Sequence, residues 1–374
     1  MSAADRARGA LYGLAIGDAL GMPTQLLSRQ QITARWGPLL TGFEPAPPGH
    51  PIAAGLPAGA VTDDTEQAVL LARMLVENRG VPGPDDWAAA LIGWELDMAE
   101  RGSLDLLGPS TKRALTAVLA GTPPEEAGRH GDTNGAAMRI TPVGIAFPAT
   151  PPPTPDADPA TPPPTSNADA ATPPPTSDAD TATPPPTSNV DANDLSRLVD
   201  RVMAASLVTH NTSVALAGAA AVAAAVSAGV GGASVAEATE AGIAAARLGA
   251  GRGHWIAGAD VAARISWATG LVKDAGPAQA AGLIGTLVGT SLATQESVPA
   301  AFAVLSVIPG DPWQACLLAA SLGGDTDTIA AMAGAVAGAC HGQSAFPPHA
   351  IAAIDAHGFA LPALADALLA LRKS

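Results

Sequence analysis

The feature that most constrains this chain's fold is a helical spacing of small apolar residues that recurs on both sides of one Pro-rich segment. Between residues 64 and 77, one helical face collects Ala68, Leu71, Ala72 and Leu75. Between residues 325 and 340, Ala330, Gly334 and Gly338 form a ridge of small residues that would let another helix approach closely. No stretch alternates Val, Ile and Thr with polar residues as a half-buried strand does. The sequence therefore predicts an all-α fold.

The Pro-rich segment, residues 148–194, divides the helical sequence into two flanks. It has no Lys or Arg, seven Asp and 15 of the chain's 35 prolines, and an 11-residue unit occurs in it four times. Such a composition cannot bury enough apolar surface to offset the chain entropy lost on folding. We expect a disordered linker inserted into a single domain that spans residues 1–374. Because the repeat has no aromatic or basic residue, a neutral insertion is favoured over a partner-docking arm.

Composition narrows the possible partners and location. With 19 Lys and Arg against 34 Asp and Glu, the formal net charge is −15, and only 3% of residues are aromatic. Both features disfavour nucleic acid as a partner. Two cysteines and no signal peptide pattern indicate a cytoplasmic protein, which we expect to be a monomer. The uncharged stretches 213–236 and 275–295 are rich in Ala and Gly, so we expect buried helices rather than membrane spans.

Two acid-rich clusters stand at predicted helix starts. The first is Thr-Asp-Asp-Thr at 62–65, and the second is Gly-Gly-Asp-Thr-Asp-Thr at 323–328. A helix N-cap accounts for one such residue in each cluster. Four carboxylates held together are costly unless a cation neutralises them. Hard oxygen donors of this kind suit Mg²⁺, Mn²⁺ or Ca²⁺. The clusters therefore indicate a metal site if the fold brings them together.

Three further features each leave two interpretations open. Asp18 lies on the apolar face of a predicted helix, where it supports a metal site or caps another helix. Asn134 and Gly135 lie in a loop of small residues that could approach a phosphate or could simply be a turn. His210 precedes an Ala-rich helix, and there it is either a ligand-binding side chain or a capping or core histidine.

Six stretches, taken in order, resemble the ADP-ribosylglycohydrolase family, which includes the dinitrogen reductase-activating glycohydrolases and the ADP-ribosyl-acceptor hydrolases. They are GLAIGDALGMPT at 13–24, TDDT at 62–65, NGAAMRITPVG at 134–144, THN at 209–211, ESVPAA at 296–301 and GGDTDTIAAMAGA at 323–335. They cover both flanks and skip the Pro-rich segment. The resemblance implies a compact orthogonal bundle of helices that holds two divalent cations, Mg²⁺ or Mn²⁺.

The resemblance also implies roles for particular residues. The expected metal ligands are Thr62, Asp63, Asp64, Asp325, Asp327 and Thr328. The expected catalytic residues are Asp63, Asp64, Asp325, Asp327 and Gln25. The residues expected to bind substrate are Asp18, Asn134, Gly135 and His210. Gln25 departs from the pattern, since many members have glutamate there, and a glutamine cannot act as a base at neutral pH.

The function implied is hydrolysis at an anomeric carbon, with the two cations lowering the pKa of a water and an aspartate receiving its proton. The expected substrate is an ADP-ribosylated protein, or a small ADP-ribosyl or nucleoside compound. One alternative is a hydrolase of free nucleosides or other small N-glycosides that uses the same site. Another is a catalytically silent ADP-ribose-binding module, which has little reason to keep four clustered carboxylates.

Overall fold

The structure, a computed structural model, describes residues 1–102, 107–149 and 191–372. These residues form helices and no strand, which confirms the all-α prediction. The α-helices are α1 (Ala3–Gly21), α2 (Arg29–Trp36), α3 (Asp63–Glu77), α4 (Pro84–Glu100), α5 (Pro109–Leu119), α6 (Pro124–Ala127), α7 (Gly135–Met138), α8 (Thr141–Ala146), α9 (Asp191–His210), α10 (Ser213–Gly231), α11 (Val235–Gly249), α12 (Val261–Val272), α13 (Pro277–Leu283), α14 (Thr294–Val307), α15 (Pro312–Ala320), α16 (Thr326–His341), α17 (Pro348–Asp355) and α18 (Leu361–Leu371). A π-helix, η1 (Ile284–Val288), follows α13, and a 3₁₀-helix, η2 (Gln343–Ala345), follows α16.

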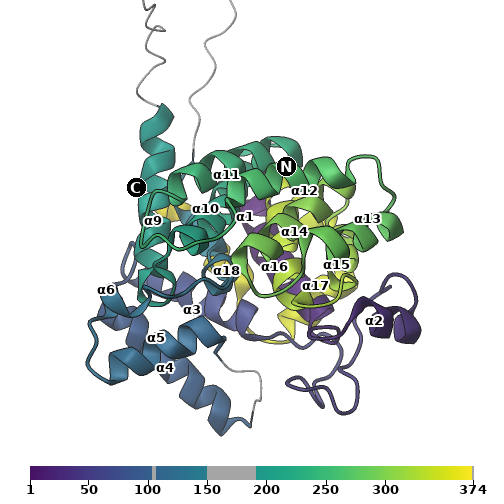
Figure 1. Ribbon diagram of the computed structural model, residues 1–374, viewed down its shortest axis with the longest axis horizontal. Coiled ribbons are helices and arrows are strands. Elements are labelled where there is room, and N and C mark those ends of the chain that lie inside the picture. Colours follow the sequence, from purple (N-terminus) through teal and green to yellow (C-terminus); the bar gives the residue numbers. More distant parts are fainter. Residues whose placement is uncertain (103–106, 150–190, 373–374) are drawn as a thin grey trace, which may run out of the picture.

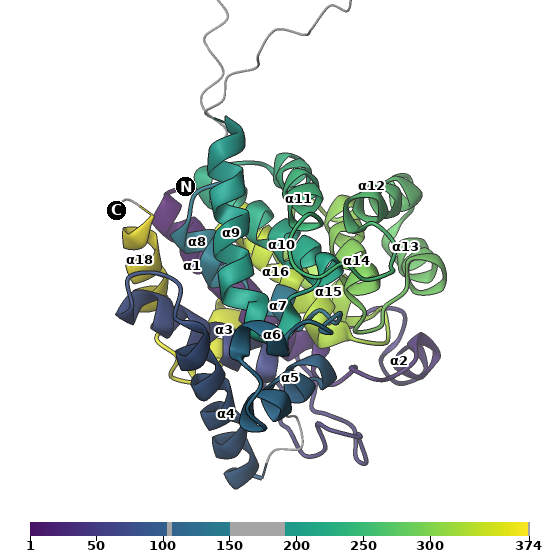
Figure 2. The ribbon, with the colours of Figure 1, turned by 60° about the vertical axis from the view of Figure 1, so that its left-hand side comes forward.

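The centre of the fold is the pair α1 and α16, which lie side by side in both ribbon views (Figures 1 and 2). A Cβ atom built on Gly13 would lie 2.0 Å from the carbonyl oxygen of Gly334, and one built on Gly334 would lie 2.0 Å from that of Gly13. Gly9 and Gly338 meet in the same way, so the two helices run antiparallel with their backbones in contact. The predicted ridge of small residues on α16 is confirmed as the surface that allows this approach.

This antiparallel packing brings the end of α1 to the start of α16. A Cβ atom on Gly21 would lie 2.4 Å from the Cα atom of Asp327. Beyond α1, the hydroxyl of Thr24 lies 3.0 Å from that of Thr326 and 2.7 Å from the carbonyl oxygen of Ala320. The chain that leads to Gln25 is therefore fixed against the second acid-rich cluster.

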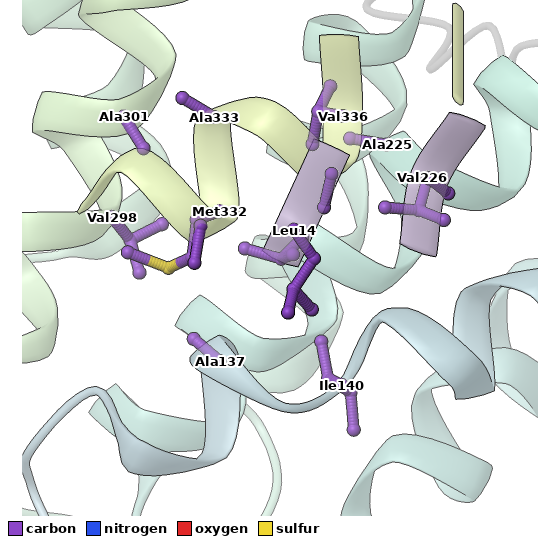
Figure 3. Packing of buried hydrophobic residues seen from close by; sticks show 14 of the residues in the cluster. Leu14, Ala137, Ile140, Ala225, Val226, Val298, Ala301, Met332, Ala333 and Val336 are labelled. Atoms are coloured by element: carbon purple, nitrogen blue, oxygen red, sulfur yellow. The ribbon is translucent and has the colours of Figure 1, made fainter. Parts of the chain in front are cut away.

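The long apolar helix α10 belongs to the same core. By length and composition it could cross a membrane, but 89% of its apolar window is buried in the fold. Figure 3 shows Ala225 and Val226 of α10 packed near Leu14 of α1 and Val336 of α16. The burial that the sequence led us to expect for residues 213–236 is thus found in α10. The same expectation for residues 275–295 is wrong: they form the short helices α13 and η1 and a following loop, and most of them are exposed or only partly buried, because they lie at the edge of the fold. Small side chains let several helices share this core at close range.

A second group of helices, α4, α5 and α6, lies on one side of the body, where each contacts α9 (Figure 2). The first turn of α5 faces the ends of the central helices across the cavity described below. Tryptophan and leucine side chains fix α4 to the core, since Trp87 and Leu91 are both fully buried. This group therefore supplies the wall of the site that the central helix pair does not.

The boundaries of the Pro-rich segment differ from the prediction of 148–194. Helix α9 begins at Asp191, so the last four residues of the predicted linker are helical. At the other end, the amide of Ala149 donates to the hydroxyl of Ser227 at 2.7 Å, which ties this buried residue to α10. The prediction of disorder for residues 150–190 lies outside the described residues.

Replacing residues 150–190 with a short Gly/Ser linker should leave the fold intact. The entropy of closing a loop changes only logarithmically with its length, so we expect the free energy of unfolding to change by about 1 kcal/mol or less. Urea denaturation of the parent and the shortened chain measures this difference. Loss of soluble protein on shortening would show that the segment packs on the body, and the linker interpretation would be wrong.

Candidate functional site

The starts of α3 and α16 meet at a cavity of about 370 Å³. Its lining includes seven of the residues singled out from sequence: Gln25, Asp63, Asn134, Gly135, Asp325, Asp327 and Thr328. A larger cavity of about 780 Å³ borders the Gly323–Gly324 segment, but among the described residues its lining has no carboxylate. The smaller cavity is therefore the candidate site, since it concentrates the groups that can do chemistry.

Asp18 of α1 organises the first cluster by binding the start of α3. Its carboxylate accepts hydrogen bonds from the amide and hydroxyl of Thr62, at 2.9 and 2.8 Å, and from those of Thr65, at 3.1 and 2.5 Å. A carboxylate at a helix N-terminus satisfies amides that have no partner within the helix. Asp18 thus caps α3, one of the two interpretations that the sequence left open.

Because Asp18 is fully buried, it lies beneath the cavity and not in its lining. Both of its oxygens already accept hydrogen bonds from Thr62, the residue that precedes α3. The structure therefore places Asp18 in support of Thr62, and the predicted contact between Asp18 and substrate stays a prediction.

The second residue of α3, Asp64, is a buried carboxylate whose hydrogen bonding is incomplete. It is buried, and Thr328 donates to its Oδ2 atom at 3.2 Å, while Oδ1 has no hydrogen-bond partner. Burial, followed by repulsion from the carboxylates of Asp327, Asp63, Asp18 and Asp325, raises the pKa of Asp64 well above its usual value of 3.8. The fold has thus brought both acid-rich clusters within electrostatic reach of one another, as the metal hypothesis requires.

Asp325, just before α16, is bound to the loop of small residues that contains Asn134 and Gly135, called the glycine loop below. The side-chain amide of Asn134 donates to Oδ2 of Asp325 at 2.5 Å and to the hydroxyl of Ser297 at 3.0 Å. Burial raises the pKa of Asp325, although hydrogen bonds from Asn134 and Thr328 oppose the rise. The backbone of Asn134 is also fixed, because its amide donates to the carbonyl oxygen of Leu292 at 2.9 Å. The loop and the acid are therefore one rigid unit.

His210 lies behind the glycine loop, fully buried and outside the cavity lining. Its Nδ1 atom is 2.8 Å from the hydroxyl of Thr209, and its Nε2 atom is 3.0 Å from that of Thr133. Burial, followed by repulsion from Arg139 and Arg113, lowers the pKa of His210 well below its usual value. A neutral imidazole in this position supports the loop from behind, and the predicted contact with substrate stays a prediction.

Close packing explains why the residue after Asn134 is a glycine. A Cβ atom on Gly135 would lie 2.8 Å from Cε1 of His210. The loop therefore lies directly on the imidazole, and a side chain at this position would push the loop into the cavity.

Sequence reasoning missed a buried chain of polar residues that holds Asp63. Gln67, one helical turn after Asp63, donates its side-chain amide to Oδ2 of Asp63 at 2.9 Å. Arg139 in turn donates to Oε1 of Gln67 at 2.7 Å, and its guanidinium lies 5.5 Å from the ring centre of Trp87. Burial lowers the pKa of Arg139 to about 10, against the attraction of Asp63 and Asp64. The four-residue spacing of Asp63 and Gln67 was the available signal.

Gln25 reaches the cavity on a constrained segment. Its side-chain Nε2 atom is buried without a hydrogen-bond partner, although Gln25 lines the cavity. Its carbonyl oxygen accepts from Nε2 of His50 at 2.8 Å. The next residue, Leu26, has a φ of 60°, a left-handed backbone conformation that is rare for a bulky side chain. Unsatisfied donors and backbone strain of this kind concentrate at functional sites.

The carboxylate and hydroxyl oxygens of the site are the kind of ligands that bind a divalent cation. Among the residues that the structure describes, no group of three or more His, Cys, Asp and Glu side chains is arranged to hold a metal ion as it stands. Each cluster nevertheless pairs two carboxylates with threonine hydroxyls, and the buried Oδ1 atom of Asp64 has no hydrogen-bond donor. Such a buried carboxylate is neutralised by a proton, which its raised pKa favours, or by a bound cation, so the site is compatible with Mg²⁺ or Mn²⁺.

Comparisons with known proteins bear on the family and on the fold. A family model described as ADP-ribosylglycohydrolase matches residues 1–160 and 181–374, so the unmatched interval lies inside the Pro-rich segment. The uncharacterized protein YegU of Escherichia coli K12 is 33% identical over 353 residues, which cover 94% of this chain and 92% of that protein. An uncharacterized protein of Archaeoglobus fulgidus is 38% identical over 143 residues, which cover 38% of this chain and 43% of that protein.

The structural comparison concerns the fold. A solved structure described as an ADP-ribosylglycohydrolase-related protein complex matches 99% of each chain with a TM-score of 0.64 and 23% sequence identity. This likeness confirms the predicted type of helical bundle.

Proposed function

The chain belongs to the ADP-ribosylglycohydrolase family, and we propose that it hydrolyses the ribosyl linkage of ADP-ribosylated substrates in a reaction that needs divalent cations. Family membership supports a glycohydrolase-type activity. The observation that carries the finer proposal is the meeting of two acid-rich helix starts at one cavity, around an Asp64 oxygen that no hydrogen bond satisfies. A purely structural role gives no reason to gather these charges.

The residues that would hold the cations are those predicted from the family: Thr62, Asp63 and Asp64 at the start of α3, and Asp325, Asp327 and Thr328 at the start of α16. Mg²⁺ or Mn²⁺ bound there would orient ribose hydroxyls and lower the pKa of a water. Asp18 and Gln67 do not bind the cations in this proposal, since they hold Thr62 and Asp63 from behind. Such outer partners fix the geometry of metal ligands.

The chain's own groups would position the sugar and receive the proton. Asn134 is fixed by Asp325 and Ser297, so the glycine loop presents a constant surface to the substrate. Gln25 lines the cavity, and a change of its side-chain rotamer would let its unsatisfied amide donate to a ribose hydroxyl or to the leaving group. Because a glutamine amide cannot accept the proton at neutral pH, an aspartate of the two clusters would act as the base.

Cation binding should stabilise the protein more at about pH 8 than at about pH 5. The pKa of Asp64 is higher in the folded than in the unfolded state, so without cations the folded state loses stability as the pH rises above 3.8. A cation that binds only the native state removes this penalty. Thermal unfolding with saturating Mg²⁺ or Mn²⁺ and with chelator, at both pH values, measures the difference. Equal melting temperatures in all four conditions would contradict the cation site.

The substrate class is tested by measuring free ADP-ribose after incubation with ADP-ribosylated acceptors, beside release of base from free nucleosides. The proposal predicts release of ADP-ribose. Release of base from nucleosides alone would support the alternative, a hydrolase of small N-glycosides that uses the same site.

A further inference from the structure

Two exposed leucines stand at the mouth of the candidate site. Leu26 is 52% exposed and Leu292 is 39% exposed, and both line the cavity that contains the acids. Most large apolar side chains of this protein are buried, so exposed ones at the entrance of a polar cavity need an explanation. Among the described residues of the lining, they are the two large apolar side chains that are exposed.

The backbone of each leucine is hydrogen-bonded to a residue next to Asp325: Leu26 to Gly324, which precedes Asp325 in sequence, and Leu292 to Asn134, whose side chain binds Asp325. The amide of Leu26 donates to the carbonyl oxygen of Gly324 at 2.8 Å, which contributes to holding its left-handed backbone conformation. The carbonyl oxygen of Leu292 accepts from the amide of Asn134, whose side chain binds Asp325. The fold therefore maintains an unfavourable backbone conformation to keep a leucine next to the reacting groups, which indicates a function for the side chain.

The charges around the cavity restrict what can lie against these leucines. Among the described residues that line it, the carboxylates are Asp63, Asp325 and Asp327, and all three belong to the proposed cation ligands. Within the part of the lining that the structure describes, the basic side chain is Lys112, which pairs with Glu95 at 3.3 Å. With cations bound to these acids, the described residues of the lining would offer no further carboxylate to a positively charged leaving group.

We propose that Leu26 and Leu292 select an uncharged, flat leaving group, a nucleobase attached through nitrogen to the anomeric carbon, over the guanidinium of an arginine. This inference rests on the proposed glycohydrolase function. In the reaction, the bond between the anomeric carbon and the ring nitrogen breaks, the oxygen of water bonds to that carbon, and the ring nitrogen receives a proton. The two leucines contact the faces of the ring, while the acids and Gln25 act on the sugar.

The test compares two ADP-ribosides of known linkage, one joined to thymidine through the base and one joined to arginine. The parent should favour the base-linked compound by at least about tenfold in kcat/KM. Leu26→Asn should lower kcat/KM for that compound by about tenfold, mostly through KM, because it removes apolar contact alone. Leu26→Asp should lower it similarly and should raise kcat/KM for the arginine-linked compound. Both new residues tolerate a left-handed backbone, so the fold is kept.

Leu96→Asp provides the matched control, since Leu96 is an exposed leucine of α4 outside the cavity lining. It should leave the ratio of the two kcat/KM values unchanged. A parent that cleaves both compounds equally, or prefers the arginine-linked one, would overturn the inference and leave the glycohydrolase function standing. A parent that cleaves no ADP-riboside with any cation would overturn the proposed function, and the inference with it.

Discussion

Replacing Gly334 with valine should abolish the folded protein. Even the first atom of a side chain at this position would lie 2.0 Å from the carbonyl oxygen of Gly13 and 2.9 Å from the sulfur of Cys316. The obstacle on α1 is backbone and cannot rotate away, so α1 and α16 would have to separate. Gly334→Ala, the smallest such change, should lower the free energy of unfolding by about 3 kcal/mol or more.

Two other helical glycines give the matched control. Nothing lies within 4 Å of a Cβ atom built on Gly93 of α4 or on Gly270 of α12. Replacing either with alanine should stabilise the protein by about 0.5–1 kcal/mol, because alanine loses less backbone entropy in a helix. Urea denaturation of the three alanine variants separates packing from helix propensity. If all three behaved alike, the backbone contact between α1 and α16 would not be the centre of the fold.

The second large effect is expected at Asp325. Asp325→Ala should reduce cation-dependent turnover by about 10³-fold, because it removes a proposed metal ligand and the anchor of Asn134. The helices should remain folded, since the variant also removes one of the carboxylates that repel Asp64. On the same preparation, the amount of ADP-ribose released measures turnover, and circular dichroism measures helix content.

Asp260→Ala is the matched control for this variant. Asp260 precedes α12, outside the cavity lining, and its side chain accepts a hydrogen bond from the amide of Ala263 at 2.7 Å. Removing this cap should cost about 1 kcal/mol of stability and leave turnover unchanged. An Asp325→Ala variant that kept more than about a tenth of the parent's turnover would exclude Asp325 as a metal ligand.

The helical fold could be predicted because its signals are local. The spacing of Ala68, Leu71 and Leu75 on α3, and of Gly334 and Gly338 on α16, follows from one turn of helix and needs no knowledge of the partner. The acid-rich clusters could also be recognised from local sequence, since Asp and Thr are preferred at the starts of helices. Which helices would meet was not local information, and the sequence suggested it through the family resemblance.

The parts of the site that the sequence did not specify depend on contacts between distant segments. The two interpretations of Asp18 could not be separated until the structure placed its carboxylate against Thr62 and Thr65. Arg139 lies in the NGAAMRITPVG motif, yet nothing in that motif indicates that its guanidinium supports Asp63 through Gln67. These pairings depend on burial and on approach between helices, which a pattern of residue types does not encode.

The measurement that tests the central claim most directly is the release of free ADP-ribose by the parent protein, with Mg²⁺ or Mn²⁺ and with excess chelator. Gln25→Glu is measured in the same assay. We expect the parent to turn over with cation and to stop with chelator, and Gln25→Glu to stay within about tenfold of the parent, because an aspartate supplies the base. A parent that is inactive with every cation while Gln25→Glu is active would contradict the account and identify the protein as a silent ADP-ribose-binding module.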